Sequence, residues 1–333
     1  MATELTICMP VHNAQEYLQR SVGSILNQTY GDFRLLIYDD GSTDDGMSVV
    51  ESFRDSRIEV VRGDVNKGGI FARSRLIDAL DTKYCMWCDA DDFFCNTHAF
   101  GKAVEAISSG DYDIVNFVNY LKVFPDGKRV RNEAVFHKDT FSYSGDRLIE
   151  DCFRIDSPIV FWSKIFRSEL LKKCIPEESV LSYRTPQDDM FYFMMWWFHA
   201  RKYLNVVGSP SFYAHCMYIG VYGSTVDDFS EGNIRAMCLS LRTYLLSLYN
   251  RMTEIRPLSD KELYALLREC SFGYICDKIR KLRERGDEQQ ADALAGVFHE
   301  YFFADGVHAV NGIELFEVPD FIELIESIIH NKQ

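Results

Sequence analysis

Apolar and polar positions follow two different patterns along the first hundred residues. Short apolar runs that end at polar or turn-forming residues are typical of buried strands. Four runs fit this description: Leu5 to Val11, Phe33 to Tyr38, Ile58 to Val61 and Tyr84 to Cys88. Between them, apolar residues recur at helical spacing, first after Asn13 and again from a glycine-containing turn at residues 66–69 through Leu80. Strands and helices that alternate at this length predict an α/β fold with a mostly parallel sheet covered by helices on both faces.

The start of the first helix carries a capping pattern. Asn13 is a residue type that caps helix N-termini, and Glu16 follows three positions later. We therefore expect Asn13 to be the N-cap of this helix. Its apolar face should comprise Leu18, Val22, Ile25 and Leu26.

The pattern is less regular after about residue 110. We expect a strand over Asp113 to Phe124, a polar looping or antiparallel region over Lys122 to Gly145, and a strand or turn entering a helix over Phe161 to Lys173. Gln187 to Ala200 has helical spacing and many aromatic residues. Beyond Phe229 the pattern is almost wholly helical, which predicts a helical C-terminal subdomain.

Composition limits the class of protein. A chain of 333 residues with 47% hydrophobic content can fill a large core, and no segment approaches the roughly 18 uninterrupted apolar residues of a membrane span. The first residues lack the pattern of a signal peptide, so we expect a cytoplasmic protein whose ten cysteines are reduced. The formal net charge of −14 opposes binding to phosphate backbones, and nucleic acid is not an expected partner.

Polar side chains directly follow three of the predicted strands. Pro10 to Asn13, Asp39 with Asp40, and Asp89 to Asp92 should meet at one edge, because ligands of open α/β sheets bind at the carboxyl ends of strands. Carboxylate oxygens suit a hard divalent ion such as Mg²⁺ or Mn²⁺, which completes its shell with water and phosphate. An ordinary helix cap at Asp89 to Asp92 and an ordinary turn at residues 39–42 are the alternatives.

Two cysteines precede the second acidic stretch, in the sequence YCMWCDADD. Cys85 and Cys88 have the spacing of a zinc or redox pair. Residues three apart in a strand point to opposite faces, and the intervening Met86 and Trp87 do not favour a turn. We therefore expect both cysteines to be buried core residues.

Several longer stretches stand out for their order along the chain. They are ICMPVHNAQEYLQRSVGSILNQTYGDFRLLIYDDGSTDDG, NKGGIFARS and YCMWCDADD, followed by FWSKIFRSELL (161–171), QDDMFYF (187–193) and PSFYAH (210–215). Together they resemble the family 2 glycosyltransferases, which have the GT-A fold, a Rossmann-like sheet flanked by helices. The resemblance implies that residues 1–110 hold a nucleotide-sugar donor and that residues 111–228 hold the acceptor and a catalytic base. Residues 229–333 would form the helical subdomain.

The resemblance also implies roles for individual side chains. Asp40 would accept a hydrogen bond from uracil, and Arg73 would support the nucleotide. Asp89 would touch the ribose or the metal, and Asp91 would ligate a Mn²⁺ or Mg²⁺ ion that bridges the diphosphate. His215 would meet the diphosphate or metal, or be an ordinary histidine. Further donor-binding residues would be Pro10, Val11, His12, Asn13, Asp39, Asn66, Gly68 and Ala90.

The family inverts the anomeric carbon in one displacement, which requires a base for the proton of the acceptor hydroxyl. That base normally lies in a Glu-Asp pair before an aromatic helix, where this chain has Gln187-Asp188-Asp189. The distance along the chain from Phe191 favours Asp188, and the position of the acidic pair favours Asp189. The aromatic residues of the following helix are expected to be mostly core rather than a sugar platform.

The expected function is therefore that of a metal-dependent inverting glycosyltransferase. It would transfer a sugar from a UDP-sugar to a hydroxyl of a glycan or lipid-linked acceptor in cell-surface polysaccharide or lipooligosaccharide synthesis. The alternative is a non-catalytic nucleotide-sugar-binding partner of another glycosyltransferase. The helical tail is expected to have one or more of three roles: acceptor placement, self-association into a homo-oligomer, or peripheral contact with the inner face of the membrane.

Two patterns organise that tail. Ser259 and Glu262 form a capping box, which predicts a helix that runs to about Arg285. Near its end, five cations form either a surface for anionic lipid or a solvated helix face: Lys278, Arg280, Lys281, Arg283 and Arg285.

Overall fold

The chain forms two compact units in the computed structural model. The structure describes residues 3–117, 120–132, 140–146, 148–150, 160–182, 188–207, 213–216, 231–259, 262–263, 266, 273–303, 309–310 and 313–314. The first unit comprises Met1–Ile175 and Met195–Ile219, and the second comprises Pro176–Met194 and Gly220–Gln333.

The first unit is built on an eight-stranded sheet with the order β3-β2-β1-β4-β10-β6-β11-β9. Its strands are β1 (Leu5–Val11), β2 (Phe33–Asp39), β3 (Ile58–Arg62), β4 (Tyr84–Trp87), β6 (Ile114–Phe117), β9 (Phe141–Ser144), β10 (Lys164–Arg167) and β11 (Lys202–Val206). Only β9 and β10 run antiparallel to their neighbours in this sheet, which confirms the predicted mostly parallel arrangement. Because β10 runs opposite to β4, the residues that precede β10 lie at the carboxyl end of β4.

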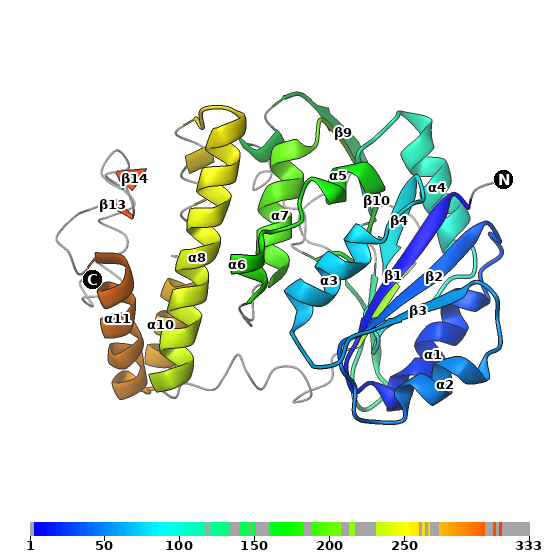
Figure 1. Ribbon diagram of the computed structural model, residues 1–333, viewed down its shortest axis with the longest axis horizontal. Coiled ribbons are helices and arrows are strands. Elements are labelled where there is room, and N and C mark those ends of the chain that lie inside the picture. Colours follow the sequence, from blue (N-terminus) through cyan, green and yellow to red (C-terminus); the bar gives the residue numbers. More distant parts are fainter. Residues whose placement is uncertain are drawn as a thin grey trace. The chain divides into compact units, whose positions relative to one another are not determined.

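Helices cover both faces of this sheet (Figure 1). The helices α1 (Gln15–Leu26), α2 (Gly46–Ser52) and α4 (Ala99–Ser109) pack on one face. The other face carries α3 (Gly69–Asp78) and the short α5 (Ser168–Lys172), which contact each other.

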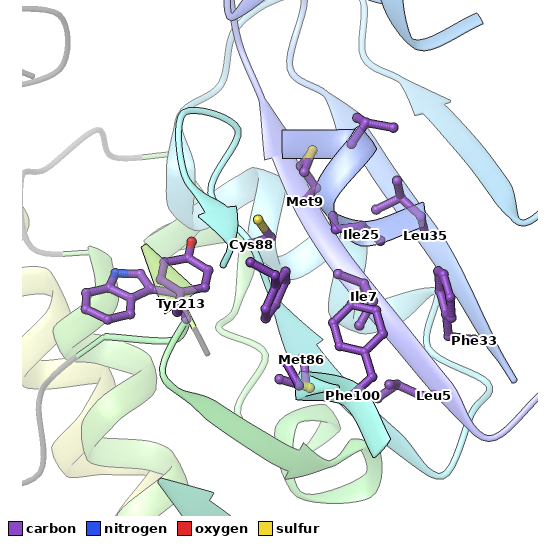
Figure 2. Close-up of a cluster of buried hydrophobic side chains, with 14 of the residues drawn as sticks. Leu5, Ile7, Met9, Ile25, Phe33, Leu35, Met86, Cys88, Phe100 and Tyr213 are labelled. Atoms are coloured by element: carbon purple, nitrogen blue, oxygen red, sulfur yellow. The ribbon is translucent and has the colours of Figure 1, made fainter. Parts of the chain in front are cut away.

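Alternate residues of β1 build the core under α1 and α4. Leu5, Ile7 and Met9 are fully buried and lie in one cluster with Ile25 of α1 and Phe100 of α4 (Figure 2). Full burial of such a side chain contributes about 1.5–3 kcal/mol. The period of two along β1 therefore fixes this strand in the sheet and, with it, the position of the residues that follow Val11.

The predicted cap of α1 was wrong. Ala14 occupies the N-cap position, and its side chain makes no capping hydrogen bond. Asn13 has a positive φ of 49°, and its Oδ1 accepts a hydrogen bond from the backbone N of Thr43 at 2.7 Å. The backbone N of Gln15 instead donates to Asp44 Oδ2 at 2.9 Å. The loop that follows β2 thus caps α1, and Asn13 binds that loop.

A second, smaller sheet has the order β5-β12-β7-β8. Its strands are β5 (Phe93–Phe94), β7 (Tyr120–Val123), β8 (Arg129–Asn132) and β12 (Tyr213–Cys216). The pair β7 and β8 is antiparallel, as predicted for part of this region. The single strand expected over Asp113 to Phe124 is two strands, β6 and β7, which belong to different sheets.

The second unit is mainly helical, as predicted for the tail. It contains α6 (Glu178–Leu181), the first part of α7 (Asp188–His199), α8 (Glu231–Ile255), α10 (Gly273–Glu284), α11 (Glu288–Phe303) and the short strands β13 (Ala309–Val310) and β14 (Ile313–Glu314). A 3-10 turn (Leu148–Glu150) belongs to the first unit. In the part of the chain that the structure describes, no helix combines the length and apolarity needed to cross a bilayer.

The predicted capping box is present in the second unit. The backbone N of Ser259 donates to Glu262 Oε2 at 2.9 Å, and the backbone N of Glu262 approaches Ser259 Oγ at 3.3 Å. The side chain of Glu262 is fully buried and also pairs with Arg256 at 2.6 Å. Part of the helix expected to continue to Arg285 lies outside the described residues.

Candidate functional site

Three strand ends meet at one edge of the large sheet. β1 lies between β2 and β4 and is parallel to both, with Val11 opposite Asp39 and Cys8 opposite Trp87. Because all three strands end at the same edge, the residues that follow them are brought together. The predicted meeting of Pro10 to Asn13, Asp39 with Asp40, and Asp89 to Asp92 is confirmed.

Asp40 ties the end of β2 to the loop before α3. It is 3% exposed, and its two carboxylate oxygens accept hydrogen bonds from the backbone N atoms of Lys67 at 2.9 Å and Gly68 at 2.7 Å. Gly41 has a φ of +66°, and a Cβ on it would lie 2.5 Å from the carbonyl carbon of Val65. Only glycine therefore allows the two loops to approach this closely. The role of Asp40 as an acceptor for the uracil of a bound nucleotide stays a prediction.

The other predicted donor residues lie around the same loops. Asp39 Oδ1 accepts a hydrogen bond from the backbone N of Ser42, three residues along the chain, at 2.9 Å, which stabilises an ordinary turn. The ring of His12 approaches the carbonyl oxygen of Asp40 through Nδ1 at 3.0 Å. Val11 is 2% exposed and its side chain belongs to the core. The remaining residues of this set range from partly buried to exposed: Pro10, Asn13, Asn66 and Gly68.

The carboxylates after β4 lie in a partly buried and acidic environment. Asp89 Oδ1 is 3.7 Å from Arg73 Nη2, and the backbone N of Asp89 donates to the hydroxyl of Tyr213 at 3.0 Å. Burial raises the pKa of Asp89 to about 7, with Asp92 and Asp91 adding to this effect and Arg73 opposing it. Burial and the charge of Asp92 raise the pKa of Asp91 to about 6. Ala90, between them, is 8% exposed.

Asp92 was expected at this edge as the end of the acidic stretch, but the sequence patterns assigned it no role of its own. It is fully buried, and its Oδ1 accepts from the backbone N of Cys216 at 2.7 Å while its Oδ2 lies 3.0 Å from His215 Nδ1. Burial alone would lower the pKa of His215, but the hydrogen bond to Asp92 and the nearby charges of Asp89 and Asp91 raise it. The signal in the sequence was a third acid placed directly before the apolar pair of β5.

The acidic stretch is not the cap of a helix. The element that follows it is β5, and α4 begins only at Ala99 with His98 at its N-cap position. The alternative that Asp89 to Asp92 is an ordinary helix cap was therefore wrong. The stretch connects the two sheets of the first unit instead.

Arg20 of α1 also contacts this stretch and was not predicted. Its Nη2 donates to the carbonyl oxygen of Asp91 at 2.8 Å and approaches Cys216 Sγ at 3.2 Å. Its guanidinium lies over the ring of Phe93, 4.7 Å from the centroid. Arg20 thus holds the backbone of the acidic stretch from the side of α1.

The two cysteines before the acidic stretch belong to the core, as predicted. Cys85 and Cys88 are both fully buried, and Figure 2 shows Cys88 among the apolar side chains of the core. Burial raises the pKa of the Cys85 thiol to about 12, which opposes formation of a metal-binding thiolate.

The side chains at this edge have the chemistry of ligands for a divalent metal ion. Asp89 and Asp91 offer carboxylate oxygens, and a cation beside them would offset the burial and repulsion that raise their pKa values. Asp92 engages one nitrogen of His215, which is how a carboxylate commonly orients an imidazole that binds a metal through its other nitrogen. Over the described residues, no three or more His, Cys, Asp or Glu side chains already converge as a metal cluster. Water and phosphate would have to supply the other ligands.

The two candidates for the catalytic base belong to the second unit. Asp188 is the first residue of α7, and Asp189 is partly buried. Their role, and their placement relative to Asp89 and Asp91, stay predictions. Gln187 lies outside the described residues. The aromatic residues of α7 are core residues, as predicted, because Phe191, Phe193, Trp196 and Trp197 are at most 1% exposed.

Comparison with known families decides the classification. The model of the family described as Glycosyl transferase family 2 matches residues 6–173, just over half of the chain. The chain belongs to this family. The family that the sequence motifs indicated is therefore confirmed.

Several curated proteins are similar to part of this family 2 chain. It is 34% identical over 94 residues to an uncharacterized glycosyltransferase of Haemophilus influenzae, a match that covers 28% of the chain and 38% of the relative. It is 33% identical over 90 residues to UDP-Glc:alpha-D-GlcNAc-diphosphoundecaprenol beta-1,3-glucosyltransferase WfgD of Escherichia coli, with 27% and 36% covered. The matches thus span little more than a third of the length of these relatives.

Solved structures share the fold of the family 2 chain. The crystal structure of residues 1–349 of S. aureus TarS has a TM-score of 0.62 at 18% identity and covers 98% of this chain and 88% of that one. The mannosyltransferase PcManGT from Pyrobaculum calidifontis, in complex with GDP-Man and Mn²⁺, has a TM-score of 0.50 at 13% identity, with 98% and 85% covered. These likenesses confirm the predicted GT-A fold.

Proposed function

We propose that this family 2 chain is a metal-dependent inverting glycosyltransferase. It transfers a sugar from a UDP-sugar to a hydroxyl of a glycan or lipid-linked acceptor, in cell-surface polysaccharide or lipooligosaccharide synthesis. The observation that carries the proposal is the placement of Asp89 and Asp91 at the end of β4, with Arg73 3.7 Å from Asp89 and His215 held by Asp92. Such a group of carboxylates and cations suits a diphosphate bound through a divalent ion.

The names of similar proteins support the choice of donor and acceptor. The full name of WfgD gives UDP-Glc as its donor and a diphosphoundecaprenol-linked sugar as its acceptor. TarS 1–349 has been solved in complex with UDP and with UDP-GlcNAc. A UDP-sugar and a lipid-linked or polymeric acceptor are therefore the first substrates to test.

Each residue of the site has a distinct task in this proposal. Asp89 and Asp91 would hold a Mn²⁺ or Mg²⁺ ion, with His215 available as a nitrogen ligand. When bound, the ion neutralises charge that develops on the departing diphosphate. Arg73, whose guanidinium lies 5.3 Å from the ring centroid of Phe161, would add a fixed positive charge on the side of α3.

The proton of the acceptor hydroxyl needs a carboxylate base. We assign this task to Asp188, with Asp189 as the alternative, because both begin the aromatic helix α7. Residues 1–110 would hold the donor, residues 111–228 the acceptor and the base, and residues 229–333 the helical subdomain.

Location and assembly are part of the proposal. We place the protein in the cytoplasm, with peripheral contact to the inner face of the membrane and self-association as roles of the helical subdomain. The basic cluster at the end of α10, which extends to Arg285, is one candidate for membrane contact. Within it, Arg283 lies 3.3 Å from Asp292 and 3.6 Å from Glu288, which favours the alternative of an ion-paired helix face for this residue.

Release of UDP tests the proposal directly. The protein is incubated with a panel of UDP-sugars and Mn²⁺, with and without lipid-linked acceptors, and free UDP is measured. We expect metal-dependent release with at least one donor. Tight UDP binding without release from any donor would contradict transfer, and would favour a non-catalytic partner of another glycosyltransferase.

A further inference from the structure

Trp162, the second residue of the FWSK stretch, packs flat on two side chains of β12. Its ring centroid lies 5.0 Å from that of Tyr213 with an interplanar angle of 5°, and 5.0 Å from that of His215 with an angle of 14°. The ring of Tyr120 in β7 packs edge-on against Trp162, with 4.6 Å between the ring centroids. Trp162 itself is only 6% exposed. Because Tyr213 and His215 are two residues apart, they lie on the same face of β12, where one indole contacts both.

Both stacked side chains hold the acidic stretch. The hydroxyl of Tyr213 accepts the hydrogen bond from the backbone N of Asp89 at 3.0 Å. The imidazole of His215 lies 3.0 Å from Asp92, which in turn accepts from the backbone N of Cys216. The first and last residues of the stretch Asp89 to Asp92 are therefore held by the two rings on which Trp162 stacks.

The stack fixes the orientation of both rings. The χ2 torsion of a tyrosine or histidine is broad when nothing packs on the ring. An indole lying parallel to both rings restricts that rotation and adds the energy of offset aromatic contacts. Trp162 also lies two residues before β10, which pairs with β4. It thus connects the large sheet to the side chains that hold the end of β4.

We propose that Trp162 is a positioning residue of the candidate donor site. It holds Tyr213 and His215, and through them it sets the backbone at Asp89 and the carboxylate of Asp92. The consequence for the metal and the diphosphate rests on the function proposed above. The effect on the acidic stretch itself does not.

Hydrogen exchange of backbone amides, followed by NMR without metal or donor, tests this role. The amides of Asp89 and Cys216 report on the acidic stretch, and the amides of Lys67 and Gly68, held by Asp40, serve as a reference in the same unit. In Trp162→Leu we expect exchange at Asp89 and Cys216 to accelerate by about tenfold relative to the reference amides. Trp162→Phe, which retains an aromatic face, should show a smaller acceleration.

Trp197→Phe is the control matched to Trp162→Phe. Trp197 is also fully buried in the first unit, and its ring packs on Tyr203, 4.8 Å between centroids. This variant should leave unchanged the ratio of the exchange rates at Asp89 and Cys216 to those at the reference amides. The proposal is overturned if Trp162→Leu accelerates exchange at all four amides equally, since Trp162 would then be a core residue without a specific role. It is also overturned if Trp197→Phe changes the ratio of exchange rates as much as Trp162→Phe does.

A second measurement separates this proposal from the proposed function. If the wild-type protein binds UDP in a Mn²⁺-dependent manner, Trp162→Phe should raise the Mn²⁺ concentration needed for half-maximal binding several-fold, and an unchanged Mn²⁺ requirement would overturn the role of Trp162 toward the metal. If the wild-type protein binds no UDP with any metal, the proposed function fails. The exchange data still decide whether Trp162 positions the acidic stretch.

Discussion

The carboxylate of Asp92 and the imidazole of His215 lie 3.0 Å apart, between Oδ2 and Nδ1, with Asp92 fully buried and the side chain of His215 33% exposed. The buried partner cannot be reached by a ligand, and the exposed partner can. Asp92 therefore supports the site from within, while Asp89, Asp91 and His215 remain available to a ligand.

Replacement of Asp92 should destabilise the protein to a degree set by its hydrogen bonds. Asp92→Ala leaves the backbone N of Cys216 buried without an acceptor, and should lower the free energy of unfolding by about 3 kcal/mol. Asp92→Asn keeps an oxygen for that donor and should cost about 1 kcal/mol. Urea unfolding followed by circular dichroism measures both. Equal losses in the two variants would contradict the assigned hydrogen bonds.

Binding of Mn²⁺ should weaken as the pH falls from 8 to 5.5. The pKa values of Asp89 and Asp91 are raised to about 7 and about 6, so protons compete with the ion for both carboxylates in this range. Titration calorimetry in buffers of different ionisation enthalpy measures both the affinity and the protons released. An affinity that is constant over this range, with no proton release, would show that the ion binds elsewhere.

The catalytic base can be located by isosteric substitution. We expect Asp188→Asn to abolish UDP release while leaving UDP binding nearly unchanged, because a base toward the acceptor need not touch the nucleotide. Turnover and UDP affinity are measured on the same preparation. Normal turnover in Asp188→Asn, together with loss of turnover in Asp189→Asn, would move the base to Asp189.

The capping box in the second unit should contribute measurably to its stability. Ser259→Ala removes the hydroxyl next to the backbone N of Glu262 and should cost about 1 kcal/mol. Glu262→Gln weakens the ion pair between the fully buried Glu262 and Arg256, whose side chain is 24% exposed, and should cost more, about 3 kcal/mol. Thermal unfolding of the two variants tests this order. A larger loss in Ser259→Ala would contradict it.

Much of the first unit could be predicted from the sequence because local pattern and long-range structure agree there. The apolar runs of β1, β2 and β4 are bounded by polar residues, and a parallel sheet necessarily brings their carboxyl ends together. The two cysteines could be assigned to the core because the side chains of a strand alternate between its faces. Neither inference needed a contact between distant residues.

The remaining features depend on partners that are distant along the chain. Asn13 has the sequence pattern of a cap, but the backbone of Thr43 takes up its side chain. Asp92 could not be separated from Asp89 and Asp91 by residue type, because its burial arises from β12, more than a hundred residues later. Sequence spacing likewise could not reveal that β6 and β7 join different sheets.

Mn²⁺-dependent release of UDP by the wild-type protein and by Asp91→Asn, with UDP binding measured in the same samples, tests the central claim most directly. The account predicts that wild-type turnover requires Mn²⁺ or Mg²⁺, and that Asp91→Asn loses turnover and metal-dependent UDP binding without losing stability. Wild-type turnover at full rate in the presence of a chelator, or full activity of Asp91→Asn, would contradict it.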